Sequence, residues 1–248
     1  MQSFAEMLEL AEQYEHELPP APPAFELPPG GQIAGWIDHT LLKPEATAAQ
    51  VKAVCQDALE YRFASVCINP AYVSLAHGLL APAKLPVCTV IGFPLGASLP
   101  EYKAFETLAC LSAGASEIDM VINIGALKGA AYGLVLNDIQ AVVTTAHNQG
   151  ALVKVILENA LLSRREKIIG CLLCQAARAD FVKTSTGFGP GGATVEDVAL
   201  MRRVVGAGMG VKAAGGVRTL ADAQAMILAG ANRLGASSGV TIVREATA

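Results

Sequence analysis

The chain has 248 residues, of which 52% are hydrophobic and 16% charged, with a formal net charge of −4. This composition supports a full core and excludes a disordered chain, and the 24 glycines follow no collagen-like period. The chain has no apolar run of 18 residues, so we expect no membrane as a partner. It also has no surplus of basic residues, so we expect no nucleic acid as a partner.

Residues 1–32 differ from the rest of the chain because they hold six acidic residues and no Lys or Arg. Apolar side chains at helical spacing over 4–18 predict one short amphipathic helix, and six prolines within 19–29 predict a stiff linker. The helix could dock on its own domain, dock on a neighbouring subunit or stay mobile. The segment lacks the features of a secretory signal, so we expect a cytoplasmic protein. We also expect a homo-oligomer, with a dimer favoured.

Short β-branched runs alternate with helix-like stretches from about residue 33 onwards. Strands are predicted near 34–38, 64–68, 87–91, 117–122, 152–156, 179–183, 210–213 and 233–235. Helix starts are predicted at Thr47, at Pro100-Glu101, and at the capping patterns 163–166 and 194–197. Apolar strands that alternate with helices indicate a parallel sheet covered on both faces.

The number of predicted strands separates two parallel-sheet architectures. Eight strands in residues 33–248 give about 27 residues per βα unit. An open, doubly wound sheet has fewer strands, and no dinucleotide or P-loop phosphate motif follows any of them. We therefore predict an α/β fold, a (β/α)8 TIM barrel at 33–248, with residues 1–32 as an N-terminal helix and Pro-rich extension. Its active site should lie at the carboxyl ends of the strands.

Three lysines, Lys154, Lys183 and Lys212, are each preceded by valine and are spaced 29 residues apart, about one βα unit. We interpret them as occupying the same position of three consecutive strands, next to Asp119 on the strand before. A buried salt-bridge network is the structural alternative. The functional interpretation is that crowded cations in a partly dry site lower the pKa of one lysine, whose neutral amine forms a Schiff base with a carbonyl group. Such chemistry needs no metal or other cofactor, and we expect none.

Glycine-rich loops follow the last three predicted strands, at 184–192, 213–218 and 235–239. Such loops expose backbone N–H groups to an anion, and the loops after strands 7 and 8 are the usual phosphate site of a barrel. Ordinary turns are the alternative. The loop directly after Lys183 makes this lysine the favoured nucleophile.

The ordered series of motifs resembles the deoxyribose-phosphate aldolase family from about residue 37 to 243. The matching segments are 37–40, 63–70, 90–96, 117–123, 181–187, 211–218 and 235–238. The resemblance implies a class I aldolase that cleaves 2-deoxy-D-ribose 5-phosphate, a small phosphorylated sugar, to D-glyceraldehyde 3-phosphate and acetaldehyde. It implies a cytoplasmic barrel enzyme without metal, and it gives no guide to residues 1–32.

The resemblance also implies roles for individual residues. Lys183 matches the Schiff-base lysine, and Asp119 and Lys212 match the proton-relay pair. Five residues match positions near the substrate phosphate, and we add Thr186 from the loop after Lys183. The resulting phosphate positions are Thr186, Gly187, Gly215, Gly216, Ser237 and Ser238. Some members of the family carry a lysine after the first of these glycines, whereas this chain has Phe188.

Other residues are weaker candidates. Lys154 is expected to line the pocket, and Phe93 with Leu95 to form an apolar wall. Asp38 is expected to end the first strand, where it orients a cation or a sugar hydroxyl or, as an equal alternative, has a helix-capping or structural role. His39 is expected to be structural.

The six cysteines, at 55, 67, 88, 110, 171 and 174, lie mostly in apolar runs. We interpret them as buried, reduced thiols, and the C-x-x-C at 171–174 as helix packing.

Two other functions remain open at this point. One is a barrel lyase or isomerase acting on a different small sugar phosphate, which a panel of substrates would distinguish. The other is a protein that binds phosphorylated sugars without turnover, which the set of Asp119, Lys183 and Lys212 argues against.

Overall fold

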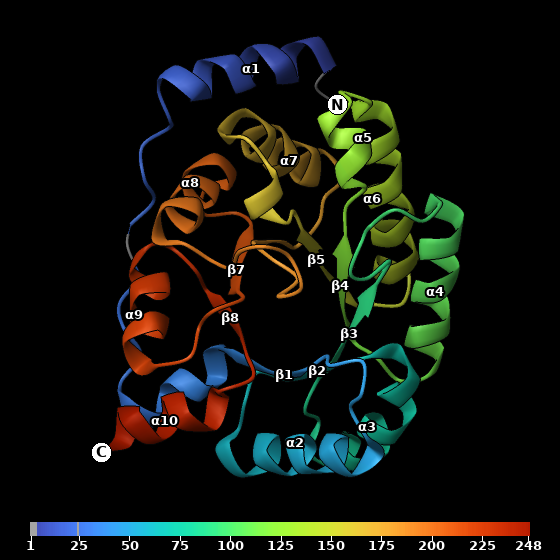
Figure 1. The fold of residues 1–248 in the computed structure, drawn as a ribbon, viewed down its shortest axis with the longest axis vertical. Helices are drawn as coiled ribbons and strands as arrows, with labels where there is room; N and C mark the ends of the chain where they lie inside the picture. The colour runs from blue at the N-terminus through green and yellow to red at the C-terminus, as the bar shows by residue number, and fades with distance from the viewer. Residues whose placement is uncertain (1–3, 24) are drawn as a thin grey trace.

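Eight parallel strands form a closed barrel in a computed structural model that describes residues 4–23 and 25–248 (Figure 1). The strands are β1 Ile37–Leu41, β2 Ser65–Ile68, β3 Val87–Ile91, β4 Glu117–Val121, β5 Leu152–Ile156, β6 Phe181–Lys183, β7 Gly210–Ala214 and β8 Arg233–Ala236. Each strand pairs with its neighbours in chain order, and β8 pairs with β1. The predicted (β/α)8 barrel is confirmed.

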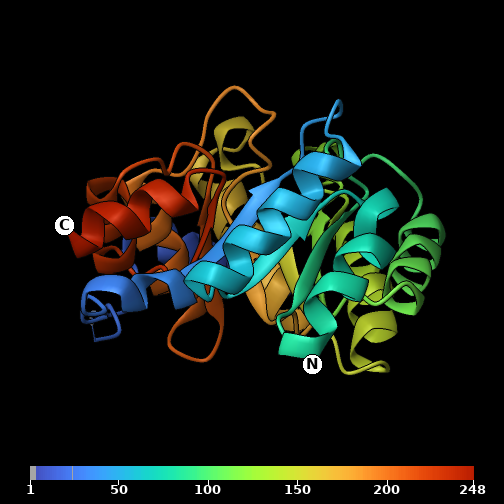
Figure 2. The same ribbon diagram turned by 90° about the horizontal axis from the view of Figure 1, so that it is seen from below.

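Helices surround the barrel, as the two perpendicular views show (Figures 1 and 2). The α-helices are α1 Phe4–His16, α2 Ala48–Tyr61, α3 Val73–Leu80, α4 Pro100–Ser112, α5 Ile124–Lys128, α6 Tyr132–His147, α7 Arg164–Ala176, α8 Val195–Val205, α9 Leu220–Leu228 and α10 Gly239–Thr247. Short 3-10 helices are η1 Gly30–Trp36, η2 Pro70–Tyr72, η3 Ala81–Ala83 and η4 Asn159–Leu161.

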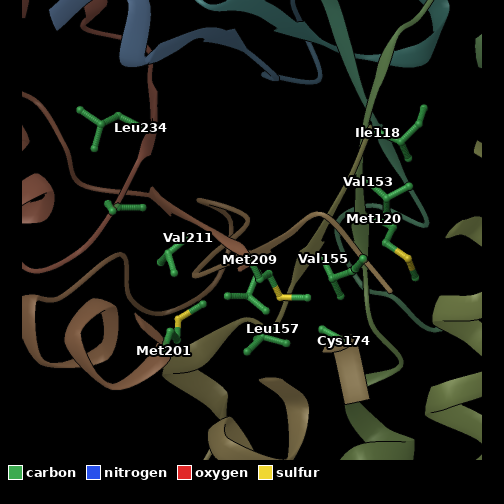
Figure 3. Packing of buried hydrophobic residues seen from close by; sticks show 14 of the residues in the cluster. Ile118, Met120, Val153, Val155, Leu157, Cys174, Met201, Met209, Val211 and Leu234 are labelled. Carbon is green, nitrogen blue, oxygen red and sulfur yellow. The ribbon is translucent and has the colours of Figure 1, made fainter. Parts of the chain in front are cut away.

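Side chains alternate between the two faces of the strands. Ile118 and Met120 of β4, and Val153 and Val155 of β5, belong to the buried core between the strands and the surrounding helices (Figure 3). The residue between each pair is charged, and it points into the barrel. The main core therefore lies outside the barrel wall, whereas the interior holds charged groups beside a small apolar cluster that includes Cys67, Cys88 and Val90.

The predicted strand positions agree with the structure except at the first strand. We predicted a strand at 34–38, but residues Gly30–Trp36 form the 3-10 helix η1 and β1 runs over Ile37–Leu41. The apolar run Ile33–Trp36 resembles a strand in sequence, yet it packs with α10 and with Phe25, which meets the Trp36 ring edge-on at 5.7 Å. Asp38 is therefore the second residue of β1 and does not end it.

The predicted helix starts are confirmed. Thr47 and Ser163 each form a capping box, with Gln50 and Glu166 respectively. The Thr194 hydroxyl accepts a hydrogen bond from the Asp197 backbone N–H, and Pro100 is the first residue of α4. Each such cap stabilises the fold by about 1 kcal/mol, so these local signals fix where the helices begin relative to the strands.

The N-terminal helix docks on its own chain, which was one of the three alternatives left open by the sequence. α1 packs against α7 on the outside of the barrel, with Met7 and Ala11 buried (Figure 1). Arg165 of α7 forms an ion pair with Glu15 at 2.6 Å. The Arg203 guanidinium donates hydrogen bonds to the backbone carbonyls of residues 18 and 19. The linker is thus fastened to α8.

All six cysteines fall within the described part of the chain and are free and buried, as expected. Across that same part, no helix combines the length and apolar character needed to cross a bilayer.

Candidate active site

A cluster of charged side chains occupies the barrel interior. Asp119 lies at its centre: its Oδ2 atom is 2.7 Å from Nζ of both Lys183 and Lys212, and its Oδ1 atom is 2.9 Å from Nζ of Lys154. Asp38, from β1, is 2.5 Å from Nζ of Lys212. Since β1, β4 and β7 are not adjacent strands, these side chains meet across the interior, and the structure brings the three predicted catalytic residues into direct contact.

Two residues that were not predicted complete the cluster. Glu117 Oε2 is 2.6 Å from Nζ of Lys154 and 3.2 Å from the Arg233 guanidinium. Arg233 also lies 2.7 Å from Asp38. Four cations therefore face three carboxylates. The sequence signal was present, because Glu117 precedes Asp119 by two residues on the same strand and so shares its face.

The three lysines do not lie at the same height along the barrel axis. This corrects our interpretation that they occupy the same position of three consecutive strands. In the strand register Lys183 lies opposite Lys212, whereas Lys154 lies opposite Phe181, two residues below Lys183. Lys154 is level with Asp119 instead. The stagger of neighbouring strands in a closed barrel produces this offset despite equal sequence spacing.

The central carboxylate is held ionised. Burial alone would raise the pKa of Asp119, but the ammonium groups of Lys154, Lys183 and Lys212 together hold that pKa well below its ordinary value. Asp119 is therefore available as a proton acceptor at neutral pH.

We expected the crowded cations to lower the pKa of one lysine, and neither Lys154 nor Lys212 is that lysine. Burial favours the neutral amine of Lys212, yet the Asp119 and Asp38 carboxylates raise its pKa above the ordinary value. The same opposition, with Asp119 as the main anion, raises the pKa of Lys154. Asp38 adds to the effect of Asp119 at both lysines, and Glu117 adds to it at Lys154.

A cavity of about 360 Å³ opens above the cluster at the carboxyl ends of the strands. Among the three clustered lysines, only Lys183 contributes to its lining. Lys154 and Lys212 are fully buried, with their ammonium groups bonded to carboxylates. Lys183 is therefore the lysine that a small molecule in the cavity can reach.

Most of the predicted phosphate positions line this cavity, namely Thr186, Gly187, Gly215, Gly216 and Ser237. Gly215 and Gly216 both have φ of 86°, which favours residues without a β carbon. The loops after β6 and β7 touch: the Ala193 N–H donates to the Gly215 carbonyl at 2.9 Å, and a Cβ on Gly192 would lie 2.2 Å from that oxygen. Glycine is thus needed where the two loops meet.

Four predicted residues lie elsewhere. Lys154, Asp38, Phe93 and Ser238 are not among the described residues that line the cavity. The first two lie in the charged cluster, where Asp38 accepts hydrogen bonds from Arg233 and Ser65 and so orients a cation. Phe93 packs edge-on against Phe188, with ring centroids 5.3 Å apart.

His39 lies inside β1, stacked on Phe63 at 4.7 Å, with Nε2 3.3 Å from the Asp57 carboxylate. This packing agrees with the expected structural role.

Two cations of the cavity lining were missed by the sequence analysis. Lys43 follows β1 and Arg218 follows the glycine pair of β7, and both side chains are exposed at the cavity. Each stands in a loop directly after a strand, and that position was the available signal. They give the outer part of the cavity a positive charge that suits an anionic group.

Two groups of side chains within the described residues bring potential metal-ligand atoms within 4.8 Å of one another: Cys67, Cys88 and Asp119, and Asp38, Cys88 and Glu117. Their carboxylates already face Lys154, Lys212 and Arg233. The positive charges of these lysine and arginine side chains would repel a metal ion, so we assign no metal to either set.

Two curated relatives are similar over most of the chain. A deoxyribose-phosphate aldolase from Halalkalibacterium halodurans is 62% identical over 85% of this chain and 94% of that protein. One from Streptococcus gordonii is 61% identical over 86% of this chain and 96% of that protein.

Solved structures extend the similarity to nearly the whole length. A Coccidioides immitis protein aligns with a TM-score of 0.91 and 42% identity over 98% of both chains. A deoxyribose phosphate aldolase from Aeropyrum pernix, described as tetrameric, aligns with a TM-score of 0.83 and 32% identity over 98% of this chain and 97% of that one. A family model described as DeoC/LacD family aldolase matches residues 33–246. The chain therefore belongs to the DeoC/LacD aldolase family.

Proposed function

We propose that the protein catalyses the reversible retro-aldol cleavage of 2-deoxy-D-ribose 5-phosphate to D-glyceraldehyde 3-phosphate and acetaldehyde, through a Schiff base on Lys183. The observation that carries this proposal is the position of the Lys183 ammonium group. It borders the cavity and lies 2.7 Å from Asp119, which also contacts Lys212. The names of the relatives, aldolases of deoxyribose phosphate, supply the substrate.

Imine formation requires proton movement at two atoms. Lys183 reacts as the neutral amine, and its nitrogen bonds to C1 of the open-chain sugar to give a carbinolamine. Asp119 Oδ2 contacts both lysine nitrogens, so it accepts the proton that Lys183 releases. Lys212, held protonated by its carboxylate neighbours, donates towards the carbinolamine hydroxyl, which leaves as water.

Cleavage then uses the positive imine nitrogen as an electron acceptor. The C2–C3 bond breaks, its electron pair forms the C1–C2 double bond of an enamine, and the C3 hydroxyl loses its proton to become the aldehyde of glyceraldehyde 3-phosphate. Protonation of the enamine at C2 and addition of water to the imine release acetaldehyde and regenerate the amine. The relay of Asp119 and Lys212 serves these proton transfers in both directions.

The direct test is an assay for both products. Purified protein with 2-deoxyribose 5-phosphate should yield acetaldehyde and glyceraldehyde 3-phosphate in equal amounts. An isomerase would yield no acetaldehyde, and a binding protein would yield neither product, so either result would contradict the proposal.

The substrate phosphate should contribute strongly to catalysis, because the exposed cations Arg218 and Lys43 border the same cavity as Lys183. We expect kcat/KM for unphosphorylated 2-deoxyribose to be at least about 100-fold lower, with part of the loss in kcat. Arg218→Ala should lower kcat/KM for the sugar phosphate by about 10-fold or more and leave that for 2-deoxyribose nearly unchanged. Steady-state kinetics on both sugars measures this, and equal efficiency on the two would show that the loops are only turns.

We also propose that the protein is a homo-oligomer, with a dimer favoured. The outer face of α4 supports this proposal, because Tyr102 and Phe105 are 66% and 72% exposed there, beside Leu99 and Leu108. Light scattering on the purified protein measures the mass directly, and a monomer at micromolar concentration would contradict it.

A cytoplasmic location belongs to the same proposal. Its support is the six free, buried cysteines, which a reducing compartment preserves. Cell fractionation followed by immunodetection tests the location.

Residues 1–32 should be dispensable for catalysis, because α1 docks outside α7 and none of the described residues of this segment lines the cavity. A chain that begins at Pro29 loses the burial of Met7, which stabilises the fold by about 2 kcal/mol. We expect a Tm lower by about 4–8 °C and a kcat within about threefold of the full chain. Calorimetry and kinetics on the two chains check this. Loss of activity in a truncated protein that remains folded and has the same number of subunits would contradict the division at residues 32 and 33.

A further inference from the structure

Glu158, directly after β5, has a backbone conformation that the fold does not explain by itself. Its φ of 57° and ψ of 61° lie in the left-handed region, which costs free energy for a residue with a β carbon. Four other non-glycine residues in the described chain have positive φ, and each follows the C-terminus of a helix by one or two residues. They are Arg62, Lys84, Ala130 and Arg178. Glu158 instead precedes the short helix η4, so its strain needs another source of support.

The Glu158 side chain is buried and holds the loop that follows Lys183. It is 2% exposed, and its Oε2 atom accepts hydrogen bonds from the Thr186 backbone N–H, at 3.2 Å, and from the Thr186 hydroxyl. The same hydroxyl oxygen accepts a hydrogen bond from the Phe188 N–H at 3.0 Å. A Cβ on Gly189 would lie 2.9 Å from Glu158 Cδ, so the loop passes directly over the carboxylate.

This loop is the wall between two cavities. Thr186 and Phe188 line the cavity above Lys183, and they also line a second cavity of about 240 Å³. The second cavity is bordered by Glu158 and by the apolar side chains of Pro94, Leu95, Ile124 and Leu161. Glu158 therefore fixes the wall from the side opposite the reacting lysine.

We propose that Glu158 is a positioning residue for substrate binding: it holds Thr186–Gly189 in the conformation that receives the substrate phosphate. This inference rests on the proposed function. Glu158 acts through the loop and not through its charge, because both hydrogen bonds end on Oε2, whereas Oε1 has no hydrogen-bond partner among the described residues. A glutamine in its place keeps one carbonyl oxygen, which can accept both bonds.

The test compares Glu158→Ala with Glu158→Gln. Alanine removes the link between residue 158 and the loop, whereas glutamine preserves it. For Glu158→Ala we expect kcat/KM on 2-deoxyribose 5-phosphate to fall about 10- to 100-fold, mainly through KM, while kcat/KM on 2-deoxyribose changes less than about threefold. Glu158→Gln should stay within about fivefold of wild type on both sugars. Glu166→Gln, on the neighbouring helix α7, is the matched control.

Hydrogen exchange of the Thr186 and Phe188 amides provides a readout that needs no substrate. We expect at least 10-fold faster exchange in Glu158→Ala and wild-type protection in Glu158→Gln. The inference is overturned if Gln is as damaging as Ala, if both sugars lose efficiency equally, or if the amides keep their protection without the carboxylate. If Glu158→Ala does not fold, Glu158→Asp, whose shorter side chain draws the carboxylate away from Thr186, replaces it under the same criteria. Wild-type protein that cleaves neither sugar would instead refute the proposed function, while the exchange data still test the positioning.

Discussion

Replacing Lys183 with methionine is expected to lower kcat by about 10,000-fold or more while the barrel remains folded. Methionine has a similar length and no amine, so the covalent step is lost and only binding remains. The environment can accept this change, because Asp119 still contacts Lys154 and Lys212 after the substitution. Steady-state kinetics gives the loss in kcat, and circular dichroism verifies the fold.

Covalent capture tests the same lysine without relying on a rate. Wild-type protein treated with acetaldehyde and borohydride should gain one two-carbon unit at Lys183, located by peptide mapping, and Lys183→Met should gain none there. The control is Lys84→Met, which replaces an exposed lysine directly after η3 and should be captured like wild type. An adduct found only on Lys154 or Lys212 would refute the assignment.

Asp119→Asn and Lys212→Leu should each lower kcat by about 100- to 10,000-fold, which is the usual contribution of a general acid or base. Asparagine keeps the shape of Asp119 but cannot accept a proton from Lys183. Leucine removes the proton donor and leaves Asp38 with Arg233 at 2.7 Å, the Ser65 hydroxyl at 2.8 Å and Lys154 at 3.7 Å. Kinetics on the sugar phosphate, with the rate of borohydride capture as a second readout, measures both effects.

A buried aspartate outside the cavity provides the control for the relay. Asp138 is fully buried in an ion pair with Lys103 at 2.6 Å, and it does not line the cavity. Asp138→Asn should therefore lower the Tm and leave kcat within about threefold. If Asp119→Asn or Lys212→Leu keeps more than a tenth of wild-type kcat, that residue does not belong to the relay.

The strand pattern and the inward-facing charged positions of β4 and β5 were predictable because they depend on local rules. Alternation along 117–121 and 152–156 places apolar residues against the helices and charged residues inside, so a short segment is enough to identify both. Helix caps such as Thr47 with Gln50 are equally local. The predicted position of the first strand was wrong because the preceding segment, Gly30–Trp36, has a strand-like composition. Contacts with distant residues pack that segment as a 3-10 helix.

The charge balance of the site was not predictable, because it depends on the stagger between strands. Equal spacing in the sequence suggested that Lys154 is level with Lys183, whereas the register places it two residues lower, beside Asp119 and Glu117. Arg233 joins the same layer from β8, which no spacing rule links to β4. The sign of the lysine pKa shifts follows from these non-local contacts, so it required the structure.

The composition of the interior cluster has a consequence for the whole reaction cycle. With Lys183 protonated, the cluster carries one unit of excess positive charge, since Lys154, Lys183, Lys212 and Arg233 face Asp38, Glu117 and Asp119. If Lys183 carries the Schiff base, its nitrogen is neutral in the free nucleophile, and three cations then face three carboxylates. The positive charge of the iminium is balanced by the proton that Lys212 gives to the departing water, and the proton of the C3 hydroxyl restores the charge of Lys212 when the enamine forms. Because these protons stay within the relay and the substrate, the barrel can complete a turnover without a counter-ion entering or leaving its buried centre.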